Sequence, residues 1–424
     1  MDWIAYARRI DPSPEATLGQ LQWRLAAFLV TLLAELATIL ITWQVWQARS
    51  VVVGQLQNLP PPNLPVVALP AVSFGVLLLV SLLPVIVWPR IGVFVHGGVL
   101  LVACLFDQHR LEPQFIALWV LLWGCVSQRG AWFARWFLAS MWLWAGLHKW
   151  FSPEWFGVNS WNIIKQCGFS PHHYLEFATI VATGETVVGL AAIITRKTAA
   201  VLCLLQHVGI LLFLSPLFYD FNESVWPWNA ATAFVGAWLF WNAPAPVSLA
   251  PRQWAVVAVL FLTPATYYLG WINPHMAHIL YSDHMPKAWL STHANTKSLH
   301  SWGGLKVPFP DSHWLFLQLF EQTASPGDKL YVQDPRLLIE NRYYLLDVDR
   351  HAVQIDRDRF LGGDKDQGEV AGVEFDDKNA AFLLERSGAV LDRNEDKLIK
   401  SVSWHAVELD VEKMKLLARL PNLR

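Results

Sequence analysis

The uneven distribution of charged side chains constrains the fold of this chain more than any other feature. Only 13 of the 32 Lys and Arg residues and 11 of the 34 Asp and Glu residues lie in residues 1–270, which make up most of the 424 residues. A water-facing domain of that size needs many more charges to cover its surface. Hydrophobic residues make up 54% of the chain, which also excludes disorder. The sequence therefore predicts a membrane-embedded region followed by a water-soluble region.

Residues 25–270 contain nine apolar stretches, which we interpret as the transmembrane helices of an all-α membrane domain. A helix needs about 20 mostly apolar residues to cross the hydrocarbon core. The predicted spans are 25–46, 66–88, 91–106, 113–127, 131–150, 173–195, 198–218, 226–242 and 253–270. The spans 91–106 and 113–127 are short. They form either a tight hairpin with residues 107–110 at its tip among the lipid headgroups, or a re-entrant pair.

The basic residues between these stretches predict the orientation. With the N-terminus in the cytoplasm, nine Lys and Arg residues fall on the cytoplasmic side and four on the other. This agrees with the positive-inside rule for an inner or plasma membrane. Residues 1–24 show no removable signal peptide and are predicted to form a cytoplasmic N-terminal segment. An odd number of spans then places the C-terminal region outside the cytoplasm.

Residues 271–424 are predicted to form a connector and a small extracytoplasmic α+β domain. Residues 271–310 are rich in His, Pro, Ser and Gly, so we expect an ordered connector near the membrane surface. For residues 311–424 we expect helices at 312–323, 379–386 and 410–420 and strands at 329–332, 343–348, 352–355 and 398–409.

Several classes of ligand are disfavoured by the sequence. A net charge of −2 gives no basic surface for nucleic acid. The spacing of the four cysteines fits no metal motif. His172, His173 and Glu176 have a weak ligand spacing at a helix start, but we expect no metal site there.

Ionisable residues within predicted spans are costly and are therefore candidates for function. Lys149 ends the span 131–150 and shares a helical stripe with Trp142, seven residues earlier. Gly146 leaves room beside it for a neighbouring backbone or a ligand. Lys149 either reaches the headgroups and complements the helix dipole, or is a partly desolvated amine that can act as a base.

The spans contain further ionisable residues, among them Glu185, His207, Glu35 and His96. Glu185 and His207 lie at similar distances from the short 196–197 turn that joins two antiparallel helices. We therefore expect them to be in contact, either lining a cleft or forming a buried structural pair. Glu35 and His96 look isolated, and we expect each to make a helix-packing hydrogen bond.

The segment Trp142–Trp155, WLWAGLHKWFSPEW, resembles the aromatic-Ala-Gly-x-x-Lys segment of the horizontally transferred transmembrane (HTTM) and vitamin K-dependent γ-carboxylase-like membrane family. DoxX-like membrane proteins are more distant relatives. Supporting features are the turn at 106–108, the mid-helix Glu185 and the following His207. The resemblance covers about residues 20–270.

The resemblance implies that Lys149 is a catalytic base, with His207 and Glu185 lining its cleft. It implies that the motif residues contact a cofactor that is a reduced quinone or vitamin K-like molecule; these residues are Trp142, Gly146, His148 and Trp155. The C-terminal region is smaller than in the carboxylases, which favours quinone-linked redox chemistry over protein carboxylation. The alternative is a non-catalytic assembly or anchoring protein in the lipid bilayer, whose extracytoplasmic region binds a protein partner.

Overall fold

A computed structural model of the chain describes residues 2–11, 16–47, 59–61, 64–65, 73–242, 250–279, 281–292, 296–299, 305–308 and 310–361. The chain divides into two units, Met1–Asp364 and Lys365–Arg424, and all described residues belong to the first. The predicted elements at 379–386, 398–409 and 410–420 lie outside the described residues.

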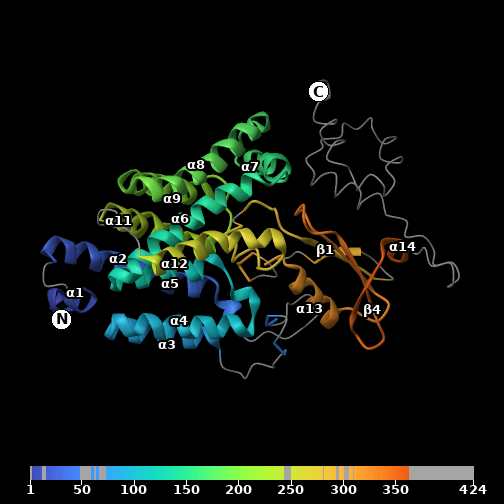
Figure 1. Cartoon of the computed structure of the whole chain (residues 1–424), viewed down its shortest axis with the longest axis horizontal. Helices are drawn as coiled ribbons and strands as arrows, with labels where there is room; N and C mark the ends of the chain where they lie inside the picture. Colours follow the sequence, from blue (N-terminus) through green and yellow to red (C-terminus); the bar gives the residue numbers. More distant parts are fainter. Residues whose placement is uncertain are drawn as a thin grey trace. The chain divides into compact units, whose positions relative to one another are not determined.

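The first unit is helical over most of its first 270 residues (Figure 1). Local sequence explains several helix starts: Thr17 and Gln20 form a capping box before α2, Ser127 caps α6, and prolines begin α4, α5 and α12. The α-helices are α1 (Trp3–Ile10), α2 (Leu18–Ile41), α3 (Phe74–Val87), α4 (Pro89–Phe106), α5 (Pro113–Val126), α6 (Gln128–Trp150), α7 (Ser160–Gln166), α8 (Tyr174–Ile194), α9 (Arg196–Leu214), α10 (Trp226–Ala231), α11 (Ala237–Trp241) and α12 (Pro251–Leu262). A π-helical turn, Thr232–Gly236, joins α10 to α11, and the 3₁₀ segment η7 (Pro264–Leu269) follows α12.

Within the described residues, four helical segments are long and apolar enough to cross a membrane: Leu18–Ile41, Pro89–Phe106, Pro171–Ile194 and Arg196–Leu214. At most 39% of the most apolar part of each is buried. Soluble monomers rarely expose such continuous apolar surface. These helices are therefore compatible with an integral membrane protein. α3, α5 and α12 are apolar but shorter.

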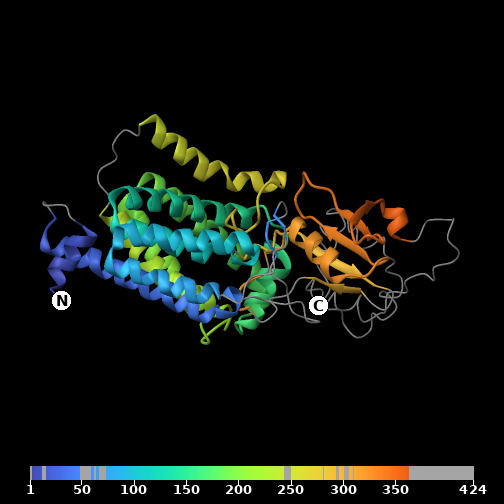
Figure 2. The same cartoon turned by 90° about the horizontal axis from the view of Figure 1, so that it is seen from below.

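A helical segment lies within each of the nine predicted spans in the described part of the chain. How many of them cross a bilayer, and in which direction, stays a prediction. The helix of the first predicted span, α2, begins at Leu18, seven residues before the predicted start, because the capping box lies there. α3 and α4 lie side by side in both ribbon views (Figures 1 and 2).

The turn at 107–110 is covered by protein, and whether it is a hairpin tip among the headgroups or part of a re-entrant pair stays a prediction. Asp107, Gln108, His109 and Arg110 are all buried, at 4% exposure or less. Arg110 Nε donates to the carbonyl of Val45 at 2.9 Å, and burial lowers the pKa of Arg110 to about 10. The carbonyl groups around the guanidinium satisfy its donors, so this turn can be buried instead of reaching water.

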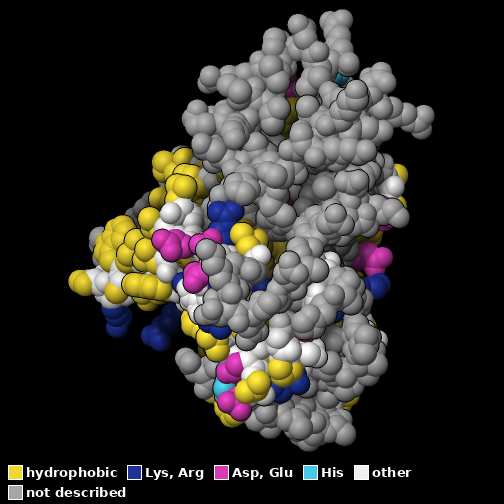
Figure 3. Space-filling model, turned by 90° about the vertical axis from the view of Figure 1, so that its right-hand side faces the viewer, with side chains coloured by type: hydrophobic (Ala, Val, Ile, Leu, Met, Phe, Trp, Pro, Cys, Tyr) yellow, Lys and Arg dark blue, Asp and Glu magenta, His cyan; other side chains and the backbone are white. Residues whose placement is uncertain are grey.

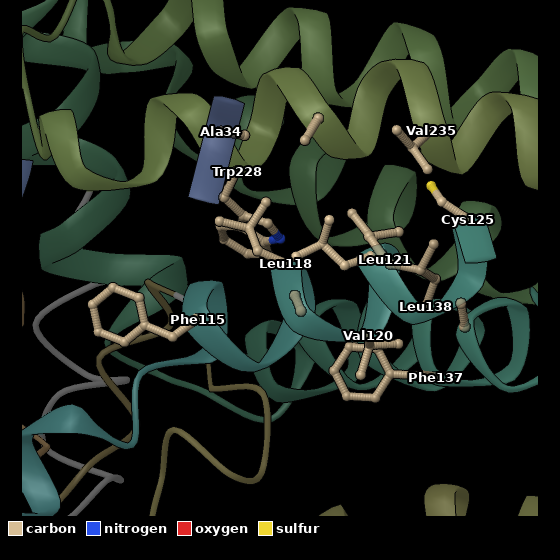
Figure 4. Packing of buried hydrophobic residues seen from close by; sticks show 14 of the residues in the cluster. Ala34, Phe115, Leu118, Val120, Leu121, Cys125, Phe137, Leu138, Trp228 and Val235 are labelled. Atoms are coloured by element: carbon tan, nitrogen blue, oxygen red, sulfur yellow. The ribbon is translucent and has the colours of Figure 1, made fainter. Parts of the chain in front are cut away.

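The helical core is built around α5, of whose 14 residues 11 are buried. Figure 4 shows Leu118 and Leu121 of α5 among side chains of other helices, including Ala34, Trp228 and Leu138. This central position explains why α5 is apolar on all sides, because each of its faces meets another helix.

The region after residue 286 contains a five-stranded antiparallel sheet of order β2-β1-β3-β4-β5. Its strands are β1 (Lys287–Ser291), β2 (Thr296–Ser298), β3 (Lys329–Gln333), β4 (Arg342–Leu346) and β5 (Ala352–Ile355), and its helices are α13 (His313–Thr323) and the short α14 (Arg357–Phe360). α13 packs its apolar face, including Phe316 and Phe320, into the same buried cluster as Leu290 and Leu330 of the sheet. On the face shown in Figure 3, described hydrophobic side chains gather at the left edge, and acidic and basic side chains are intermixed elsewhere.

The predicted helix at 312–323 and the strands at 329–332, 343–348 and 352–355 are confirmed, with small shifts of their ends. The interpretation of 271–310 as a connector alone is corrected, since β1 and β2 belong to the sheet. β1 alternates partly buried and buried residues, as expected for a strand with one covered face. Its three central residues, Ala288–Leu290, are all apolar, so this alternation does not appear in the sequence.

Candidate functional site

Lys149 and Glu185 form a buried ion pair between α6 and α8. Lys149 Nζ lies 2.7 Å from Glu185 Oε2, and the two side chains are 2% and 11% exposed. Lys149 is in the last turn of α6, whereas Glu185 is in the middle of α8. An ammonium group that reached the headgroups would be exposed, so the snorkelling interpretation does not describe this side chain.

Two glycines allow the helices to approach closely enough for this contact. A Cβ atom at Gly146 would lie 2.5 Å from the backbone nitrogen of Thr186, and one at Gly189 would lie 2.5 Å from that of Leu143. Any larger residue would separate the helices. The space beside Gly146 is therefore filled by the backbone of α8, and this position contributes to helix packing.

Trp155 lies beside the ion pair. Lys149 Nζ is 5.3 Å from the centroid of the Trp155 ring, which is a cation–π distance. The indole donates to the carbonyl of Ala178 at 3.1 Å, and the Trp155 backbone N–H donates to Ser152 Oγ at 3.1 Å. The predicted residues Lys149, Glu185 and Trp155 thus come together in one site.

An apolar groove of about 390 Å³ lies next to Trp155. The Trp155 and Phe177 rings are 6.1 Å apart, and Phe177 stacks on Phe213 at 5.5 Å. The lining residues are Ile164, Phe169, Phe177, Gly209, Leu212, Phe213 and Phe218. Aromatic rings with few polar atoms suit a flat, apolar ligand.

The expected contact between Glu185 and His207 is wrong, because His207 bonds to other partners. Trp142 Nε1 donates to His207 Nε2 at 2.9 Å. His207 Nδ1 is 2.7 Å from Asn229 Oδ1, and since Nε2 accepts, Nδ1 carries the proton and donates. Glu185 and His207 lie at similar distances from the turn that joins α8 and α9, but this does not determine which faces of the two helices meet. His207 points toward α6 and α10. Trp142 and His207 form a second polar cluster, separate from the ion pair.

His148, the neighbour of Lys149, faces the connector. Its Nε2 is 2.8 Å from the carbonyl of Ala277, and its Nδ1 is 2.8 Å from the Tyr268 hydroxyl. The carbonyl can only accept, so Nε2 donates and Nδ1 accepts from the hydroxyl. His148 therefore joins α6 to the segment after η7, and both of its ring nitrogens are used within the protein.

The sequence did not reveal that Glu35 and His96 are partners. His96 Nε2 lies 3.0 Å from Glu35 Oε1, and Nδ1 lies 2.7 Å from Ser81 Oγ. The three residues are on α2, α4 and α3 and are almost fully buried. Ser81 also donates to the Leu78 carbonyl at 2.7 Å. The only sequence signal was that each of these two ionisable residues lies within a predicted span, and this did not pair them.

A further buried acid, Glu112, precedes α5. His275 Nδ1 lies 3.3 Å from Glu112 Oε1, with side chains 3% and 0% exposed. Burial raises the pKa of Glu112, and the nearby His275 opposes part of that rise. Among the described residues, no group of three His, Cys, Asp or Glu side chains could hold a metal ion. His173 and Glu176 are 3.9 Å apart and well exposed.

Comparisons with known proteins found no relative of this chain. No protein-family model, curated protein or solved structure is significantly similar to it.

Proposed function

We propose that this protein is a quinone-linked membrane enzyme of the HTTM and vitamin K-dependent carboxylase-like type, with Lys149 as its base. The observation that supports this proposal is the buried Lys149–Glu185 pair beside Trp155 and an aromatic groove. The proposal includes the predicted orientation, with the N-terminus in the cytoplasm and the sheet region outside it.

A base at position 149 requires a neutral amine. Glu185 Oε2 lies 2.7 Å from Lys149 Nζ and can accept the ammonium proton. Desolvation disfavours both charges, so the neutral amine and carboxylic acid lie closer in free energy to the ion pair than they would in water. Lys149 would then accept a proton from a ligand hydroxyl group, and Glu185 would hold the proton that Lys149 gave up.

The apolar lining of the groove, which includes the rings of Phe177 and Phe213, supports a quinone site there. Trp155 separates the groove from the amine by one ring. A bound reduced quinone would supply the two-electron chemistry. Trp155 would have to move to bring the hydroxyl group of the reduced quinone to Lys149.

Two variants with matched controls test this function. Lys149→Ala should abolish the oxidation of an added reduced quinone by dissolved molecular oxygen, which takes up the two electrons and two protons, when the purified protein is in lipid nanodiscs. Lys165→Ala should not, although Lys165 also lies over a Trp ring, because it is exposed. Phe213→Ala should lower the quinone that mass spectrometry finds bound, whereas Phe94→Ala on α4 should not.

A second candidate is a non-catalytic assembly or anchoring protein. The observation that favours it is that His148 and His207 use both ring nitrogens within the protein. Bound quinone and oxidation that are equal in the wild type, Lys149→Ala and Phe213→Ala would support this candidate and contradict the enzyme.

A further inference from the structure

The loop between β3 and β4 exposes two consecutive leucines. Leu337 is fully exposed (101%) and Leu338 is 71% exposed. Burying such side chains is favourable, and isolated surface leucines are common, but an adjacent pair at the tip of an ordered loop forms a continuous apolar projection.

Arg336 holds this loop against the end of the helical region. Its Nη1 donates to the carbonyl of Tyr267 at 2.6 Å, and its guanidinium lies 4.4 Å from the centroid of the Tyr267 ring. Asp334 binds the same guanidinium, with Nε donating to Oδ1 at 2.7 Å. Arg336 is only 5% exposed. The position of the two leucines is therefore fixed relative to η7, which follows α12.

Residues near the contact between Arg336 and Tyr267 are also apolar and exposed. A Cβ atom at Gly270 would lie 3.0 Å from Ile339 Cδ1, so the loop touches the chain directly after η7. Leu269 is 49% exposed and Trp271 is 74% exposed. The exposed apolar side of α12, with Val259 and Leu262 at 63% and 64%, leads into this region.

We propose that Leu337 and Leu338 insert into the lipid bilayer as a membrane anchor of the sheet region. Trp271 marks the level of the interface, where exposed Trp residues are favoured. The exposed apolar surface of α12 continues through Leu269 and Trp271 to the loop, so the same lipid leaflet that covers α12 covers the leucines. The proposal requires membrane integration but not base chemistry at Lys149.

Spin labels at single cysteines test the anchor in nanodiscs of neutral phosphatidylcholine. Leu337→Cys is compared with Val348→Cys, which is 84% exposed at the β4–β5 turn. Both variants carry Cys167→Ala, because the other three cysteines are buried. The measured quantity is the ratio of the collision rate with oxygen to the collision rate with a water-soluble nickel chelate. We expect this ratio to be several-fold higher for the label at 337 than for the label at 348.

Two outcomes would overturn the anchor. Equal ratios at 337 and 348 would place the loop in water, and low collision with both reagents at 337 would mean that protein covers it. Arg336→Ala in the labelled Leu337→Cys protein should shift the ratio toward that of position 348. Lys149→Ala should leave it unchanged, which separates this proposal from the proposed activity.

Discussion

Replacement of Gly146 by Ala tests whether close helix approach positions the ion pair. The added Cβ would lie 2.3 Å from Thr186 Oγ1 and 2.5 Å from the Thr186 backbone nitrogen. The hydroxyl can rotate away, but the backbone cannot, so α6 and α8 must separate by about 1 Å to reach ordinary contact. Overpacking of this kind costs about 1–3 kcal/mol. The better helix propensity of Ala returns about 0.5–1 kcal/mol. We expect a net loss of about 0–2.5 kcal/mol of unfolding free energy, and a stability about 1–3 kcal/mol below that of a Gly→Ala variant without the clash.

Gly184→Ala is the matched control, because a Cβ there meets no atom within 4 Å and the residue lies on the same helix as Thr186. Reversible unfolding by sodium dodecyl sulfate in mixed micelles, followed by circular dichroism, measures both variants. The control should be as stable as the wild type or slightly more stable. If Gly146→Ala were as stable as Gly184→Ala, the close contact between α6 and α8 at Gly146 would be incorrect, and Gly146 would be available to a ligand.

Three further substitutions probe charge, pH and packing. Lys149→Met removes the ammonium beside Glu185 and should cost about 3–5 kcal/mol in the same unfolding assay, whereas the double variant with Glu185→Leu should recover most of this loss. Burial lowers the pKa of His313 to about 4, so the folded state favours its neutral form. The stability this provides is complete above the unfolded pKa of about 6.5 and falls by about 3 kcal/mol as the pH drops to 4. Hydrogen exchange of α13 should show that fall, and His313→Gln should flatten it. Phe316→Ala empties a fully buried position between α13 and the sheet and should cost about 3–5 kcal/mol by the same exchange measurement, with the helical core unaffected.

The polar groups inside the helical region share one arrangement. Glu35 meets His96, Trp142 meets His207, and Lys149 meets Glu185, each across two helices. Apolar helices in lipid lack a hydrophobic preference for one another, so such contacts select which faces pack. The proposed base therefore lies in a pair that also fixes the position of its helix.

The sequence by itself predicted a mostly helical region followed by a small sheet. Apolar stretches of about 20 residues are typical of helices that are compatible with a membrane, and the charged C-terminal region can cover a sheet that faces water. Helix existence, the α13 segment and three strands followed from periodicity and caps, which are local properties. The sequence also singled out Lys149 as a candidate, since an ionisable residue within a predicted span is rare enough to stand out.

Only the tertiary structure decided which residues meet. Depth along two antiparallel helices predicted Glu185 beside His207, but the rotation of each helix about its axis placed Lys149 there instead. That rotation depends on Gly146 and Gly189, whose effect is a contact with another helix and has no local sequence signature. Glu35 and His96 are 61 residues apart and looked isolated for the same reason. Sequence spacing reports neighbours within one helix, whereas a binding site is formed by the faces that several helices present to each other.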